Sequence, residues 1–176
     1  MTAKTNKTNG RILAQRAIGR AESGLYFLGE ILNGESGETD IACSRSLYIL
    51  FSYNFELILS SLVCLDNSEE AGSSVIQKLK CIRPQHDYGE LSKLISKESL
   101  KKVGITSVTR EGRDFIEYHV KLLDKSIIKI QDLVDVRYDF KKDTRRNINP
   151  HEMSDMKDTL EKLLKITPLI SGLAWD

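Results

Sequence analysis

Residues 47–65 have the sequence LYILFSYNFELILSSLVCL, which is apolar over most of its length. The stretch is nearly long enough to span a bilayer, but Asn54 and Glu56 lie at its centre. An ionisable residue at that depth costs at least about 2.5 kcal/mol on insertion scales, and no second segment resembles this one. A helix that is apolar on most of its faces is typical of the centre of a bundle. We therefore expect no membrane span, and a central helix from about Ile41 to Leu65.

The composition of the chain is that of a soluble globular protein. Of its 176 residues, 40% are hydrophobic and 29% are charged, and a chain of this size needs no disulfide or metal to fold. The 26 Lys and Arg nearly balance the 25 Asp and Glu, which excludes a uniformly basic surface but not a local basic patch. Cys43, Cys64 and Cys81 are far apart and form no Cys-x-x-Cys pair. We expect a cytoplasmic protein without disulfides, bound metal or cofactor.

The N-terminal part of the chain divides into a tail and a helix. Residues 1–10 are polar and lack the apolar segment of a signal peptide, so we expect a disordered tail there and one domain over residues 11–176. Apolar residues at helical spacing predict a first helix from Arg11 to Leu32, which Asn33-Gly34 ends. Small residues recur along it and would allow a neighbouring helix to approach closely: Gly19, Gly24 and Gly29.

Shorter helical segments are predicted after the central helix. One covers Ser74 to Ile82 and ends before Pro84. Asp87 and Glu90 form the acidic pair of a capping-box-like start for another. Apolar residues follow this start at helical spacing: Leu91, Leu94, Ile95 and Leu100.

Two further long helices complete the predicted fold. One runs from Glu111 to about Phe140, with Thr109 as its cap. Its apolar residues keep the three-and-four spacing of a core-facing stripe: Ile116, Val120, Leu123, Ile127, Ile130 and Val134. The last begins at Asn149-Pro150, with Asn as N-cap and Pro at the first helical position. The sequence thus predicts an all-α fold, an up-and-down bundle of four long helices with one or two short helices between the second and the third.

Three stretches of the chain, in this order, resemble a known family. They are SYNFELIL at residues 52–59, QHDYGELSKL at residues 85–94 and DVRYD at residues 135–139. These stretches resemble motifs of the HEPN family. The first has the family's pattern of aromatic residues, Glu and Leu, the second its His-Asp pair before a short helix, and the third its Arg-Tyr pair. That family is named for its nucleotide-binding members in higher eukaryotes and prokaryotes. The resemblance covers roughly residues 45–151.

Some HEPN members are metal-independent ribonucleases whose motif is Arg, a polar residue, three to five others, then His. Arg146-Asn147-Ile148-Asn149-Pro150-His151 fits this pattern, but so do residues 113–119, from Arg113 to His119. A chance match is common at this length, so the pattern alone does not choose between the two. On one predicted helix, Arg113 and His119 lie about 240° apart and do not converge.

Local physical chemistry favours the first match. The cap signals place His151 at the second residue of the last helix, where free backbone N–H groups and the helix dipole favour an anion. That positive end also favours the neutral imidazole, which accepts a proton. From Arg137 to Arg146 the chain has five basic and two acidic residues, a net charge of +3. An arginine could therefore hold a phosphodiester while His151 acts as general base on a ribose 2′-hydroxyl.

The resemblance and the local charge together give two groups of candidate functional residues. The catalytic candidates are Arg146, Asn147 and His151. The candidates for binding phosphate or ligand are Arg137, Tyr138, Lys141, Lys142 and Arg145. Simpler interpretations stay open: a solvated basic loop, an ordinary loop asparagine, an exposed histidine, and a cation that suits the C-terminal end of a helix.

Two functions follow from the sequence, with no metal or cofactor in either. The first is a HEPN-like ribonuclease of a toxin or antiviral defence system, for which the resemblance implies a homodimer with the site across its interface. The second is a non-catalytic HEPN-like module that binds a nucleotide or a partner protein, for example a nucleotidyltransferase antitoxin. A scaffold without any ligand is the weakest alternative.

Overall fold

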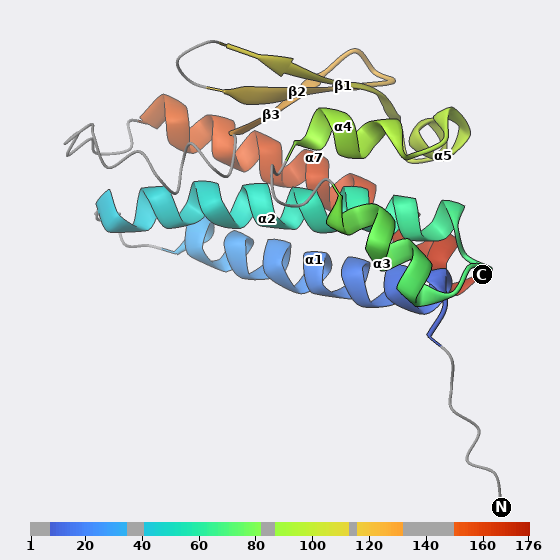
Figure 1. The fold of residues 1–176 in the computed structure, drawn as a ribbon. Helices are drawn as coiled ribbons and strands as arrows, with labels where there is room; N and C mark the ends of the chain where they lie inside the picture. Colours follow the sequence, from blue (N-terminus) through green and yellow to red (C-terminus); the bar gives the residue numbers. More distant parts are fainter. Residues whose placement is uncertain (1–7, 35–40, 82–86, 113–115, 132–149) are drawn as a thin grey trace, which may run out of the picture.

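The computed structural model describes residues 8–34, 41–81, 87–112, 116–131 and 150–176. The long helices there are α1 (Gly10–Asn33), α2 (Ile41–Asp66) and α7 (Pro150–Trp175). The short helices there are α3 (Gly72–Lys80), α4 (Tyr88–Lys93) and α5 (Lys97–Lys102). The strands there are β1 (Ile105–Glu111), β2 (Glu117–Leu122) and β3 (Ile127–Gln131), which form one antiparallel sheet in the order β1-β2-β3. Figure 1 shows the long helices side by side, with α1 and the sheet on opposite sides of α2.

Helix α1 confirms the first predicted helix almost residue for residue. Asn9 caps it by accepting a hydrogen bond from the Ile12 backbone N–H at 3.1 Å. Its buried residues recur at every third or fourth position and pack against α2 and α7: Gly10, Ala14, Ile18, Ala21, Leu25, Leu28 and Leu32. The period of the apolar residues was therefore a sufficient signal for this element.

Helix α2 is the central helix that the sequence predicts. Within the described part of the chain, one stretch, Ser46–Asp66, is long and apolar enough to cross a membrane, with a mean hydropathy of 1.6. The protein itself buries 78% of its most apolar window, as a core helix requires. Even Asn54 and Glu56 are buried, at 1% and 8% exposed. Asn54 donates from Nδ2 to the Leu50 carbonyl at 2.8 Å.

The prediction of an all-α bundle of four long helices is wrong. Where the third long helix was expected from Glu111, the described residues form the end of β1, then β2 and β3. Thr109, expected as a helix cap, lies inside β1. The described fold is thus three long helices, three short ones and a three-stranded antiparallel sheet.

The apolar residues of this region fit the period of a helix as well as that of a strand, and their packing shows that they form strands. Tyr118 and Val120 of β2 pair with Ile130 and Ile128 of β3, and all four are at most 1% exposed. Leu123, which the helical stripe placed in the core, is 54% exposed. The β2–β3 connection passes through Lys125, whose φ of 68° is left-handed and does not continue a helix.

An aromatic cluster connects the sheet to α2. The Tyr88 ring of α4 lies between Phe55 and Tyr118, with centroid distances of 5.4 and 4.7 Å. Its hydroxyl donates to the Ser52 carbonyl of α2 at 2.9 Å. Asp87 caps α4 as predicted, because its Oδ1 accepts the Glu90 N–H at 3.0 Å. The predicted helix after it is two helices, α4 and α5, with Ser96 as the N-cap of α5.

Polar side chains of two long helices also bind β3. Ser52 Oγ of α2 donates to the Gln131 carbonyl at 2.6 Å, and Lys162 Nζ of α7 donates to the Ile127 carbonyl at 3.1 Å. The two carbonyls lie at opposite ends of β3, so the strand is fixed against both helices along its length.

Candidate functional site

The start of α7 lies where the sequence predicts it. The helix begins at Pro150, and His151, its second residue, is exposed. The Asn149 cap lies outside the described residues. So do the remaining predicted catalytic and phosphate-binding residues: Arg137, Tyr138, Lys141, Lys142, Arg145, Arg146 and Asn147. Their placement relative to His151 therefore stays a prediction.

The second match to the ribonuclease motif, residues 113–119, lies partly in the sheet and so not on one helix. His119 lies in β2, so the argument from two positions on one helix does not apply to it. Its Nε2 lies 2.5 Å from Oε1 of Glu117, two residues earlier on the same side of the strand. Arg113, the other end of that match, lies outside the described residues.

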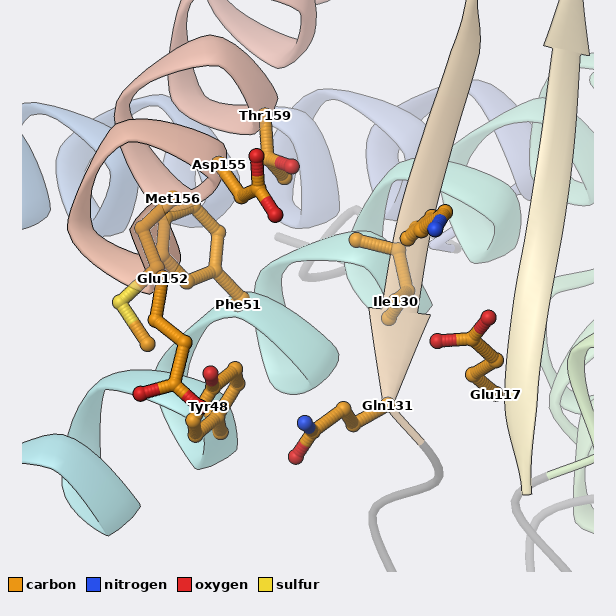
Figure 2. Close-up of a pocket in the computed structure, with 10 residues that line it drawn as sticks. Tyr48, Phe51, Glu117, Ile130, Gln131, Glu152, Asp155, Met156 and Thr159 are labelled. Atoms are coloured by element: carbon orange, nitrogen blue, oxygen red, sulfur yellow. The ribbon is translucent and has the colours of Figure 1, made fainter. Parts of the chain in front are cut away.

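A pocket of about 230 Å³ lies beside the start of α7, between this helix, α2 and β3 (Figure 2). Among the described residues, its lining from α2 is Tyr48 and Phe51. The lining from the sheet is Glu117, Lys129, Ile130 and Gln131. The lining from α7 is Glu152, Asp155, Met156 and Thr159.

The described lining of this pocket is acidic. Glu117, Glu152 and Asp155 supply three negative charges against the one positive charge of Lys129, a net charge of −2. Glu152 directly follows His151 in the chain. Carboxylates that line a pocket disfavour a phosphate inside it, while they accept hydrogen bonds from N–H groups well.

The floor of the pocket is apolar and belongs to the core. Phe51, Ile130 and Met156 are at most 4% exposed. Figure 2 shows the Glu152 carboxylate over the Tyr48 ring, with Asp155 about one turn and Thr159 about two turns further along α7. The pocket thus combines buried apolar groups with hydrogen-bonding groups at its rim, as ligand sites do.

Sequence reasoning singled out no residue of this pocket's described lining as functional. The pocket needs β3 beside α7, and the sequence was interpreted as a helix where β3 lies. The run Ile105-Thr106-Ser107-Val108-Thr109, in which every residue but Ser107 is β-branched, was the available signal for a strand. No local signal connects Tyr48 with Asp155, which are far apart in the chain.

Within the described residues, no group of three or more His, Cys, Asp or Glu side chains is placed to hold a metal ion. Comparisons of the chain with protein-family models, curated proteins and solved structures found no match.

Proposed function

We propose that this chain is a HEPN-like, metal-independent ribonuclease that acts through the start of α7. The observation that carries the proposal is the exposed His151 on the first turn of a 26-residue helix. There the backbone N–H groups of the first turn and the helix dipole favour a transition state with developing negative charge. Because the sheet replaces one expected helix, the proposal rests on α1, α2, α7 and the motif.

The proposed chemistry is a transesterification. His151 accepts the proton of a ribose 2′-hydroxyl, and the 2′-oxygen attacks the adjacent phosphorus. The bond to the 5′-oxygen breaks, which leaves a 2′,3′-cyclic phosphate on one product and, after protonation from water, a 5′-hydroxyl on the other. Arg146 stabilises the charge on the phosphate, and Asn147 orients the backbone or Arg146. The basic side chains from Arg137 to Arg145 bind the RNA backbone.

The biological setting is proposed together with the chemistry. We place the protein in the cytoplasm, as a homodimer whose site includes both copies, in a toxin–antitoxin or antiviral defence system. A nucleotidyltransferase antitoxin is the partner that the resemblance suggests. No cofactor takes part in the proposed reaction.

The test is RNA cleavage in excess chelator. Purified wild-type protein is expected to cleave structured RNA and leave 2′,3′-cyclic phosphate ends. His151→Ala is expected to reduce the rate by roughly 10²-fold or more, the usual contribution of a general base. His119→Ala is the matched control, because His119 lies on the sheet beside Glu117 and should leave the rate within a few-fold. Cleavage that survives in His151→Ala, or that requires a divalent metal, would contradict the proposal.

A second candidate function is favoured by the acidic pocket. The net charge of −2 next to His151 suits a non-catalytic module that binds a nucleotide through its base, or a partner protein. In that case clean wild-type protein does not cleave RNA under any metal condition. Ligand binding would then depend on the pocket carboxylates and not on His151.

A further inference from the structure

Two polar side chains of α7 face the pocket together. Asp155 and Thr159 are four residues apart on the helix, and both line the pocket (Figure 2). Thr159 is only 9% exposed, and its hydroxyl makes no hydrogen bond to another described residue. A threonine within a helix can return its hydroxyl to the carbonyl four residues earlier. The Thr159 hydroxyl does not do so, and as a lining group of the pocket it can donate to a ligand or accept from one.

The size and walls of the pocket restrict that ligand. Its volume of about 230 Å³ is below the roughly 300–1,000 Å³ typical of pockets for drug-sized molecules, so it fits one ring system. Phe51 and Met156 supply buried apolar surface, and Tyr48 adds an aromatic ring at the rim. These groups suit a flat, partly apolar ligand.

The charge of the pocket restricts the ligand further. A carboxylate only accepts hydrogen bonds, so Asp155 requires a donor on the ligand. The formal net charge of −2 in the described lining favours a ligand without a phosphate inside the pocket. A flat, uncharged ring with N–H donors on its edge meets all of these conditions, and an unstacked nucleobase has this chemistry.

We infer that this pocket binds a guanine base of single-stranded RNA, an inference that rests on the proposed action on RNA. Guanine is the one standard RNA base with two adjacent N–H donors on its Watson–Crick edge, and these match the two oxygens of one carboxylate. The carboxylate of Asp155 accepts both donors. Lys129 and Thr159 are two of the lining groups that have a proton to donate to the guanine O6. The phosphates lie outside, toward the start of α7.

The experiment measures the binding of four uncharged nucleosides to the full chain by calorimetry or ligand-observed NMR. Guanosine is expected to bind about 10-fold to 100-fold more tightly than adenosine, cytidine or uridine, as a bidentate contact provides. Asp155→Asn is expected to remove this preference, because an amide offers one acceptor oxygen in place of two. Glu161→Gln is the matched control, since Glu161 is exposed on α7 and does not line the pocket.

Three outcomes would overturn the inference. They are equal binding of the four nucleosides, a guanosine preference that survives in Asp155→Asn, and tighter binding of agmatine than of guanosine. The last would assign the pocket to an alkyl cation.

The base site and the proposed nuclease activity can fail independently of each other. Guanosine binding without RNA cleavage supports the base site and contradicts the nuclease. Metal-independent cleavage with no preference for guanine near the cut contradicts the base site and supports the nuclease.

Discussion

Asn54 of α2 occupies the space beside Gly24 of α1. A Cβ atom built on Gly24 would lie 2.2 Å from Asn54 Oδ1, closer than side chains approach one another. Asn54 is 1% exposed and bonded to the Leu50 carbonyl, so it has little freedom to move away. The close approach expected at the small residues of α1 is therefore present at Gly24. It is absent at Gly19, where a Cβ atom would have no neighbour within 4 Å among the described residues.

Alanine at these two glycines should change stability in opposite directions. Gly24→Ala is expected to lower the free energy of unfolding by about 1 kcal/mol, because overpacking of roughly 1–3 kcal/mol exceeds the gain in helix propensity. Gly19→Ala should raise it by roughly 0.5–1 kcal/mol, since only the propensity changes there. Urea denaturation measures both variants. Equal effects would show that α1 does not pack on Asn54 in this way.

Replacement of Lys125 by glycine tests whether β2 and β3 are joined by a turn, as in the structure, or belong to one helix. Lys125 has a φ of 68°, which is strained for a side chain and not for glycine. Lys125→Gly is therefore expected to raise the free energy of unfolding by about 1 kcal/mol. In a continuous helix the same change would lower it by about 1 kcal/mol. Lys125→Ala is the control, because it removes the long side chain and keeps the strain.

Removal of the Tyr88 hydroxyl should weaken the contact between α4 and α2. The hydroxyl is buried and donates to the Ser52 carbonyl, so Tyr88→Phe leaves this carbonyl without that donor. The expected loss is about 1 kcal/mol, measured by thermal or chemical denaturation. Tyr26→Phe provides the comparison, because Tyr26 is 70% exposed and its change should be neutral. A neutral Tyr88→Phe would argue against the contact.

The pKa of Glu70 offers a prediction about pH. Hydrogen bonds from the Lys78 ammonium at 2.6 Å and the Ser74 hydroxyl at 2.9 Å lower the pKa of this exposed carboxyl below its ordinary value. A carboxyl whose pKa is lower in the folded state adds stability above its unfolded pKa, and this stability is lost as pH falls through the folded pKa. NMR titration of Lys78→Met should therefore show the Glu70 pKa shifted upward. An unchanged pKa would contradict the ion pair in solution.

Each long helix could be predicted from a local signal: α1 from an apolar period kept over more than twenty residues, α2 from its long apolar run, and α7 from the cap residues Asn149 and Pro150. The sheet could not, since Ile116, Val120, Ile127 and Ile130 fit a helical stripe as well as two short strands. What decides between them is the packing of Tyr118 against Tyr88, a contact between distant residues. A β-branched run before Gly112 was a local warning that the helical interpretation ignored.

The candidate site was predictable only in part, for a related reason. The exposed position of His151 follows from the local cap signals around Pro150. The pocket beside it brings together Tyr48, Lys129 and Asp155 from three separate elements, so no window of sequence contains its pattern. The three carboxylates of its described lining come from β2 and α7, and the basic residues expected nearby, 137–146, lie outside the described residues.

The hydrogen bonds of Ser52 and Lys162 to β3 have a consequence for association between molecules. β3 is an edge strand, and open edges recruit strands of other chains and promote aggregation. Because the Gln131 and Ile127 carbonyls already accept these helix donors, β3 offers a poor template for such pairing. Any strand added to this sheet from another molecule would have to pair with β1, beside α4 and α5.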